Sequence, residues 1–423
     1  MKYSFTFLKT QIRQIREGGM VVLFWKFPIL FSKCLDLTLI IPAIPVVIVL
    51  QILRPFITVR LLGIDVIRVG HMCEADRYLG KHYAGMHGCG NYDIFYFFKS
   101  MNVQSNQQWL KMWRRVLRVF PFGKLAHIVD RFNKLLPGYE SFVIDLPNID
   151  CVRSKSSPGY DTLKSVLDNK RAFITFTPDE ERFGQEALRG LGIPDGTEFI
   201  CFHARDSAYM ESLDSRRDWG FQDHRDSNVY NYVPAIEKLT HQGYYAVRMG
   251  SIVKEALNIT DPSVIDYATN GKRTDFMDIY LGAKCYFFLC SNTGISVIPE
   301  SFRRPAVYVN WPYLGQAPTF VHKGLFIPKR LYLRREHRFL TFKEIINSEI
   351  GSFGSGGQFE DSGVELSENT PDEITAVVME MHKRLNGTWK DTEEDEELQQ
   401  RFWDVFGSGL LKSPDLRIGA DYL

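Results

Sequence analysis

The sequence predicts an α/β protein with parallel sheets, and three observations support this. Apolar runs of strand length alternate with amphipathic stretches of helix length through most of the chain. Hydrophobic residues make up 45% and charged residues 24% of the 423 residues, which is typical of globular proteins with sizeable cores. The polar loops that could carry chemistry follow apolar runs, as in sheets that bind ligands at the carboxyl ends of their strands.

The charge balance and the absence of certain motifs argue against several classes of function. The 51 basic and 50 acidic residues give a net charge of +1, so we predict no nucleic-acid partner. The seven cysteines form no Cys-x-x-Cys pair, which favours reduced, buried thiols over a disulfide framework or a zinc ribbon. The chain has no Asp-x-Asp or His-Glu-x-x-His motif, and we therefore predict no metal and no cofactor.

Residues 1–60 are predicted to be a basic and apolar segment that associates with a membrane. The run 37–53 holds seventeen residues without a charge, and the six basic residues between positions 2 and 33 are opposed by Glu17 alone. This composition suits the cytoplasmic leaflet of a membrane. Pro42 and Pro45 favour a bent or re-entrant segment over a straight span, and a buried core helix is the alternative.

Residues 61–193 are predicted to form an N-terminal Rossmann-like domain. A strand pattern ends at Gly70 and His71, and a helical stretch follows at 74–83. After a glycine-rich turn and a second strand, residues 108–120 form an amphipathic helix with basic residues on one face. Strands that alternate with helices in this way imply βαβ units.

Residues 194–345 are predicted to form a C-terminal Rossmann-like domain, because Gly and Pro concentrate near Pro194 and a second alternating pattern begins there. The pattern is doubly wound, with loops of interest at the carboxyl ends of strands. The expected strands are 199–203, 244–250, 285–290 and 305–310, and the expected helices are 231–243, 275–283 and the stretch that follows residue 293.

The remaining residues, 346–423, are predicted to hold a Gly/Ser-rich loop and C-terminal helices. The stretch 351–363 is expected to be a mobile loop. The acidic cluster at 391–397 precedes an apolar helical pattern, and acidic residues in a first helical turn complement the helix dipole.

Polar residues at three strand ends form the candidate ligand site. Arg205 follows the first strand of the C-terminal domain and Arg248 ends the next, although an ion pair that closes a strand end is the alternative for Arg205. The loop at 291–296 offers hydroxyls, a glycine and backbone N–H groups at a helix start, a combination that binds diphosphates. The candidate donor-binding residues are His203, Arg205, Asp206, Arg248, Ser291, Asn292, Thr293, Gly294, Ser296 and Glu300.

His71 is the candidate catalytic residue, because an imidazole at the end of a strand is suited to remove a proton from an acceptor hydroxyl. A structural histidine is the alternative. Other groups that could take the role are His82, His87, Glu74 and Asp93.

The stretch 203–310, with the motif SNTGISVIPESF, resembles a bacterial family of glycosyltransferases of surface-polysaccharide synthesis. The sequences RVGH at 68–71 and DIFYF at 93–97 are similar to the N-terminal blocks of that family. The strand-end motif at 203–206 is distantly similar to that of GT-B fucosyltransferases, although it lacks their doubled arginine.

The resemblance implies the GT-B architecture, in which two Rossmann-like domains face a cleft. It also implies a metal-independent hexosyl- or deoxyhexosyltransferase that takes a nucleotide-diphosphate sugar as donor and a lipid-linked or oligosaccharide acceptor. The expected location is the cytoplasmic face of the bacterial inner membrane. The alternatives are a nucleotide-sugar epimerase or hydrolase on the same fold, and a non-catalytic membrane-bound glycan-binding protein.

Overall fold

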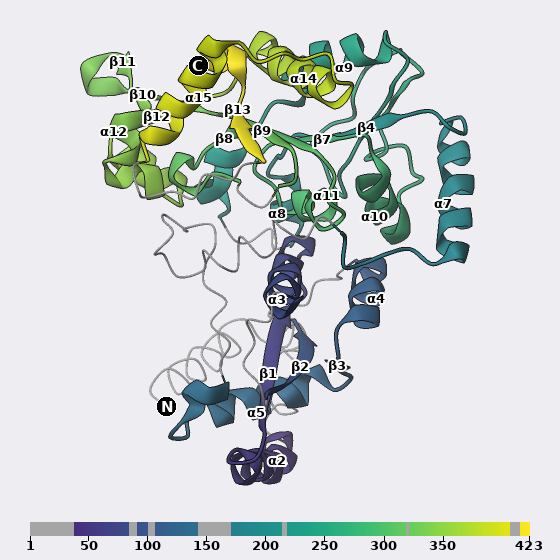
Figure 1. The fold of residues 1–423 in the computed structure, drawn as a ribbon, viewed down its shortest axis with the longest axis vertical. Coiled ribbons are helices and arrows are strands. Elements are labelled where there is room, and N and C mark those ends of the chain that lie inside the picture. The colour runs from purple at the N-terminus through teal and green to yellow at the C-terminus, as the bar shows by residue number, and fades with distance from the viewer. Residues whose placement is uncertain are drawn as a thin grey trace, which may run out of the picture. The chain divides into compact units, whose positions relative to one another are not determined.

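The structure is a computed structural model of the chain, and it divides into two units (Figure 1). The described residues are 38–83, 91–99, 106–142, 171–213, 218–318, 321–406 and 415–423. Unit 1 comprises Met1–Ile64, Gly88–Phe98 and Arg118–Ile144, and unit 2 comprises Asp65–His87, Lys99–Leu117 and Asp145–Leu423.

A seven-stranded parallel sheet forms the centre of unit 2, and its strand order is β13-β9-β8-β7-β4-β5-β6. From β4 the chain adds β5 and β6 on one side and then β7, β8 and β9 on the other. This is the order of doubly wound nucleotide-binding sheets, and it places the switch point between β4 and β7. The strands are β4 (Phe199–His203), β5 (Tyr245–Arg248), β6 (Val264–Ile265), β7 (Phe288–Cys290), β8 (Ala306–Trp311), β9 (Gly324–Pro328) and β13 (Leu416–Ile418).

Helices cover both faces of this sheet, so its strands are apolar on both sides. Along β4, Phe199 and Cys201 point into one core, whereas Ile200 and Phe202 point into the other. The predicted parallel α/β sheet is therefore confirmed. The helices of the first core are α10 (Asp275–Lys284) and α15 (Glu393–Asp404), with α7 (Pro178–Leu191) against it, and those of the second are α9 (Val233–Thr240) and α14 (Pro371–Leu385).

Three segments that the sequence assigns to the N-terminal domain belong to unit 2, and the last of them contains α7. The first holds the 3₁₀ helix η1 (Val69–Met72) and α3 (Cys73–Tyr83), and the second holds α4 (Gln107–Val116). Helix α4 is fixed to α7 by a bidentate ion pair between Arg115 and Glu180.

The Gly/Ser-rich stretch 351–363 was expected to be a mobile loop, and this expectation is wrong. It contains the end of η9 (Glu349–Ser352) and all of α13 (Gly356–Asp361). Ser355 and Gln358 form a capping box, and Phe359 is buried, so one cap and one apolar anchor are enough to order it. A small antiparallel sheet lies beside it, formed by β10 (Arg330–Leu333), β11 (Arg338–Phe339) and β12 (Val364–Ser367), with α12 (Phe342–Ile346) between β11 and η9.

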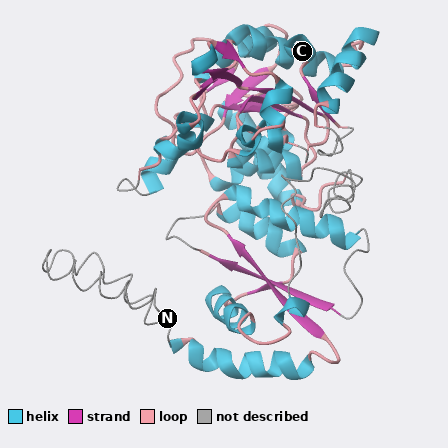
Figure 2. Cartoon of the chain, turned by 90° about the vertical axis from the view of Figure 1, so that its left-hand side faces the viewer, coloured by secondary structure: helices cyan, strands magenta, loops and turns pink. Residues whose placement is uncertain are grey.

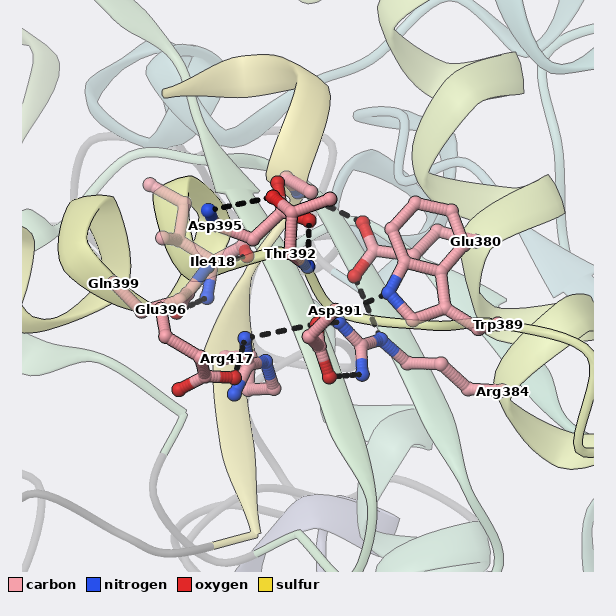
Figure 3. A network of polar contacts seen from close by, with 11 residues as sticks. Glu380, Arg384, Trp389, Asp391, Thr392, Asp395, Glu396, Gln399, Arg417 and Ile418 are labelled. Carbon is pink, nitrogen blue, oxygen red and sulfur yellow. Dashed lines mark hydrogen bonds and ion pairs between the residues drawn. The ribbon is translucent and has the colours of Figure 1, made fainter.

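The acidic cluster begins a helix, as its sequence predicts. Thr392 caps α15 in a capping box with Asp395. Asp391, just before the cap, accepts hydrogen bonds from Arg384 of α14 and Arg417 of β13 (Figure 3). The carboxylates of this segment therefore hold the C-terminal strand in place.

Unit 1 contains a three-stranded sheet, one helix against the sheet and a second helix packed on the first (Figure 2). Its strands are β1 (Thr58–Asp65), which ends one residue beyond the unit, β2 (Asn91–Phe98) and β3 (Val119–Phe120), and its helices are α2 (Ile40–Leu53), α5 (Gly123–Asn133) and the 3₁₀ helix η2 (Tyr139–Phe142). Strands β2 and β3 are parallel. Residues 143–170 lie outside the described residues, and the predicted second Rossmann-like domain stays a prediction.

Helix α2 forms most of the predicted apolar run, and it is one helix rather than a re-entrant segment. Pro42 lies in its first turn, where backbone N–H groups have no partner within the helix, so only Pro45 removes a helical hydrogen bond. Ala43 and Val47 pack against Val129 of α5. Residues 1–37, with the predicted basic stretch, lie outside the described residues. Among the described helices, none has the length and apolar character needed to cross a membrane.

Candidate functional site

A cavity of about 350 Å³ lies at the carboxyl edge of the sheet, within unit 2. The loops that follow β7 and β8 form much of its wall, at the edge where open α/β sheets bind ligands. The rest of the wall comes from η1 and α3 and from Arg225, which lies between β4 and β5. Its lining residues include Gly70, Asp76, Arg77, Arg225, Asn292, Thr293, Gly294, Ser296, Glu300, Trp311, Tyr313 and Gln316.

Half of the predicted donor-binding residues line this cavity. They form the loop after β7 and the short helices η6 (Gly294–Ser296) and α11 (Val297–Ser301). Because α11 has five residues, its dipole is small, and the charge of a diphosphate must be met mainly by side chains. Glu300 accepts a hydrogen bond from the Tyr308 hydroxyl at 2.6 Å. The lining residues of this set are Asn292, Thr293, Gly294, Ser296 and Glu300.

The two predicted cations, Arg205 and Arg248, do not line the cavity. Arg205 is buried and its guanidinium binds the Asp226 carboxylate and both oxygens of Gln222. Arg248 is also buried and donates to the Glu255 carbonyl at 2.8 Å and to Asp266 at 3.3 Å. Both guanidinium groups are held in ion pairs at strand ends, which is the alternative stated for Arg205.

The remaining predicted residues do not line the cavity, and their hydrogen bonds hold the strand ends and the loops that follow them. The Ser291 hydroxyl accepts a hydrogen bond from the Arg205 backbone N–H at 3.0 Å, which ties β7 to β4 at the switch point. His203 Nδ1 lies 2.8 Å from the Met249 carbonyl oxygen, and burial lowers the pKa of His203. Asp206 accepts hydrogen bonds from two backbone N–H groups, so its carboxylate shapes the loop.

Arg225 is a cation of the cavity that the sequence argument missed. It donates to the Asn292 carbonyl at 3.1 Å and to Gln222 at 3.4 Å, whereas its buried Nε has no hydrogen-bond partner in the described part of the chain. Burial, with Arg205 and Arg68 nearby, lowers the pKa of Arg225 to about 10. Its positive charge is thus incompletely compensated, as expected of a group that meets an anion.

Asp76 and Arg77 reach the cavity from α3, a helix predicted to belong to the acceptor domain. Asp76 accepts a hydrogen bond from Arg303 at 2.8 Å, and burial raises the pKa of this carboxyl. No strand-end motif marks these residues, because only the packing of η1 and α3 against η6 and α11 brings them there.

Two aromatic rings complete the wall, and both are held by hydrogen bonds. The Trp311 indole N–H donates to the backbone oxygens of Tyr313 and Gln316, at 3.0 and 2.9 Å. The Tyr313 hydroxyl lies 2.6 Å from His224 Nε2. Fixed aromatic faces of this kind stack on nucleobases and on sugar rings.

His71 lies in η1, between the lining residues Gly70 and Cys73, although it does not itself line the cavity. Its Nδ1 is 2.7 Å from the Asp65 carbonyl oxygen. Because a carbonyl oxygen only accepts, Nδ1 carries a hydrogen, and the tautomer that fits this contact has its lone pair on Nε2.

The other groups considered as a base are placed differently. Asp93 makes a bidentate ion pair with Arg60 at 2.6 and 2.8 Å within unit 1. His82 stacks against Tyr78, and His87 lies outside the described residues. No cluster of three or more His, Cys, Asp or Glu side chains that could hold a metal is found among the described residues.

Comparisons with known proteins find likeness at the level of structure. No protein-family model and no curated protein matches the chain. The ADP-heptose LPS heptosyltransferase II of Escherichia coli is 14% identical, with a TM-score of 0.37 over 64% of this chain and 90% of its own. A family 9 glycosyl transferase from Veillonella parvula is 12% identical, with a TM-score of 0.38 over 64% of this chain and 86% of its own. A second E. coli heptosyltransferase, solved with ADP, is 10% identical, with a TM-score of 0.28 over 64% of this chain and 91% of its own.

These neighbours are glycosyltransferases. Their identities and TM-scores are low, so the function of this chain is inferred from its own cavity.

Proposed function

We propose that the chain is a metal-independent glycosyltransferase that binds a nucleotide-diphosphate sugar in the cavity of unit 2. One observation carries the proposal: a single cavity at the carboxyl edge of a doubly wound sheet combines two arginines, two aromatic rings and two carboxylates. A nucleotide-diphosphate sugar needs these three kinds of group together: cations for the diphosphate, ring faces for the nucleobase and hydrogen-bond acceptors for the sugar. These residues are Arg77, Arg225, Trp311, Tyr313, Asp76 and Glu300.

The arginines supply the charge for the diphosphate. Arg225 and Arg77 line the same cavity as the Thr293–Ser296 loop, which adds hydroxyls and backbone N–H groups. When the bond to the sugar breaks, negative charge grows on the leaving diphosphate, and fixed cations stabilise it. The reaction as proposed therefore needs no divalent metal.

The other lining residues can bind the nucleobase and the sugar of the donor. Trp311 and Tyr313 offer ring faces for stacking, and Gln316 offers an amide for a base edge. Glu300 can accept hydrogen bonds from sugar hydroxyls, since carboxylate oxygens each take more than one donor.

His71 is proposed as the general base. Its Nδ1 is anchored to Asp65, which favours the tautomer with the lone pair on Nε2. In this proposal Nε2 removes the proton of the acceptor hydroxyl as that oxygen attacks the sugar. The acceptor is proposed to be a lipid-linked glycan of surface-polysaccharide synthesis, at the cytoplasmic face of the bacterial inner membrane, and the sugar a hexose or deoxyhexose.

Calorimetry with UDP, GDP, ADP, CDP and dTDP, each beside its monophosphate, tests the donor site. We expect one diphosphate to bind at least about tenfold more tightly than its monophosphate, since a charge-assisted contact contributes about 1.5–3 kcal/mol. The variant Arg225→Gln should lose this preference, whereas Arg401→Gln, an exposed control on α15, should keep it. Failure of all five diphosphates to bind would refute the proposal.

A second assay on the same protein distinguishes sugar transfer from other reactions of nucleotide sugars. The sugar form of the best diphosphate is incubated with and without membrane lipid extract, and its consumption is followed. If the nucleotide sugar is consumed only when the lipid extract is present, the result supports transfer to a lipid acceptor. Consumption without any acceptor would instead identify an epimerase or a hydrolase.

A further inference from the structure

The outer face of helix α2 in unit 1 is apolar and exposed. Ile41 is 75% exposed and Ile52 is 65% exposed, and Ile44 and Ile48 lie between them on the same stripe of the helix. Val46, Val49 and Leu53 widen the stripe. Most of the exposed large hydrophobic side chains among the described residues belong to unit 1, although unit 2 is much larger.

The opposite face of α2 is buried in the core of unit 1. Ala43, Val47 and Leu50 are buried against Val129 and Phe142. Residues Ile40–Leu53 contain no charged side chain, and their one polar side chain, Gln51, donates a hydrogen bond to Asn133, so the rest of α2 is apolar. A helix of this kind is stable only when its whole surface is removed from water, and here the fold of unit 1 covers one side.

Two more exposed apolar side chains belong to the segments that meet at the end of α2. Arg54 donates to the carbonyl oxygens of Pro137 and Gly138, at 3.2 and 3.3 Å, which brings the loop after α5 against the helix end. Phe56, which is 85% exposed, follows Arg54 by two residues, and Leu135, which is 77% exposed, precedes Pro137 by two residues. We call the exposed side chains of α2, Phe56 and Leu135 the apolar face.

The charged side chains of unit 1 are mainly basic. The described residues of unit 1 hold six basic and three acidic side chains. Asp93 forms an ion pair with Arg60, and Asp130 with Lys134, and each pair cancels one charge of either sign. The other described residues of unit 1 hold four basic side chains and one acidic side chain. The segment 1–37, which leads into α2, has six basic against two acidic residues.

We propose that the apolar face of unit 1 docks onto an anionic lipid bilayer, with α2 lying in the plane of the membrane surface. The charge of unit 1 and of segment 1–37 complements anionic headgroups, and the apolar face supplies the surface to be buried among acyl chains. A 14-residue helix is about 21 Å long, which is short of the roughly 30 Å hydrocarbon core, so α2 lies on the membrane and does not cross it. The proposal rests on unit 1 and is independent of nucleotide binding.

Flotation of the full chain with vesicles tests this proposal. One vesicle type is phosphatidylcholine with a third phosphatidylglycerol, and the other is phosphatidylcholine alone. The test variant replaces Ile41, Ile48 and Ile52 by Ser. The control variant replaces Phe183, Ile252 and Phe339 by Ser, which are exposed apolar residues of unit 2.

We expect the wild-type chain and the control variant to float with the anionic vesicles and to float less with the neutral ones. The test variant should bind the anionic vesicles at least about tenfold more weakly, because three large apolar side chains no longer enter the bilayer. Circular dichroism and urea unfolding verify that each variant is folded.

Two results would overturn the proposal. Unchanged flotation of the folded test variant would show that other residues, such as segment 1–37, make the membrane contact. A wild-type chain that forms a dimer in detergent-free buffer and ignores vesicles, while the test variant is a monomer, would show that a second copy covers the apolar face.

Discussion

Gly70 and Gly294 lie against each other in the wall of the cavity, and the contact is asymmetric. A Cβ atom on Gly70 would lie 3.1 Å from the Gly294 Cα atom and 3.2 Å from its carbonyl oxygen, whereas a Cβ atom on Gly294 would come no closer than 3.7 Å to Gly70. The contact joins η1 to η6, and so it holds the segment with Asp76 and Arg77 beside the loop after β7.

Gly70→Ala should therefore destabilise the protein, whereas Gly294→Ala should not. Overpacking against backbone costs about 1–3 kcal/mol, because backbone atoms have little room to move. A tolerated Gly→Ala change is neutral or stabilising by about 0.4–1 kcal/mol. Urea unfolding of the two variants measures the difference, and equal effects on the free energy of unfolding would contradict the asymmetry.

The strands of unit 2 could be predicted from the sequence because they are buried on both faces. The run from Phe199 to Phe202 is apolar throughout, and the same holds for β7 and β8, so their ends and the loop at 291–296 could be placed correctly. The three-residue strand β13 could not be predicted, because it depends on a backbone pairing with β9, about ninety residues earlier.

The cations of the site could be predicted less well, because their roles depend on distant partners. Arg205 has the position expected of a phosphate ligand, but Asp226 lies close enough in the fold to bind it. Arg225 follows no strand directly and ends the 3₁₀ helix η4 (Gly220–Arg225), so a search of strand ends passes over it. Whether an arginine meets a carboxylate or a ligand is decided by tertiary packing.

The ion pair of Arg205 leads to a prediction of stability. Arg205→Ala should lower the free energy of unfolding by about 3–5 kcal/mol, because it leaves the partly buried Asp226 carboxylate without its main partner. Adding Asp226→Asn should recover part of this loss, since the amide carries no charge. A fully stable Arg205→Ala variant that has lost nucleotide affinity would show instead that Arg205 binds the donor.

His224 leads to a prediction of pH dependence. Burial lowers the pKa of His224 to about 4, with Arg225 and Lys329 adding to the shift, whereas the pKa in an unfolded chain is about 6.5. Between these values the unfolded state binds more protons, so the contribution of His224 is present above pH 6.5 and is lost as the pH falls towards 4. The loss is up to about 3 kcal/mol.

His224→Gln should remove this part of the pH dependence, because the amide does not titrate in this range. Urea unfolding of wild type and variant at pH 7, 6, 5 and 4.5 gives the difference between their free energies of unfolding. As the pH falls, the free energy of unfolding of the variant should rise relative to that of wild type. A difference that is constant over this range would show that His224 is not held neutral.

Asp391 should stabilise the C-terminal strand in a pH-dependent manner. Its hydrogen bonds with Arg384 lower the pKa of Asp391, so its contribution is present above the ordinary carboxyl range and is lost as the pH falls. Asp391→Asn should cost about 0.5–1 kcal/mol at pH 7, since the pair is partly exposed, and it should speed amide exchange in β13. Glu394→Gln, an exposed change in the same acidic cluster, is the control. Equal exchange in both variants would contradict a role in holding β13.

The proposed base can be separated from a structural histidine by the choice of replacement. The amide nitrogen of Asn occupies nearly the place of His Nδ1, so His71→Asn can keep the hydrogen bond to the Asp65 carbonyl while Nε2 is lost. Nucleotide affinity and the free energy of unfolding should then stay close to wild type. Transfer at saturating donor should fall by about 10²–10⁴-fold, and the acidic limb of the pH–rate profile should disappear, because no imidazole remains to be protonated. His241→Asn, an exposed change elsewhere in unit 2, is the control. Near-normal transfer with an unchanged acidic limb would assign proton removal to another group and leave His71 a structural role in η1.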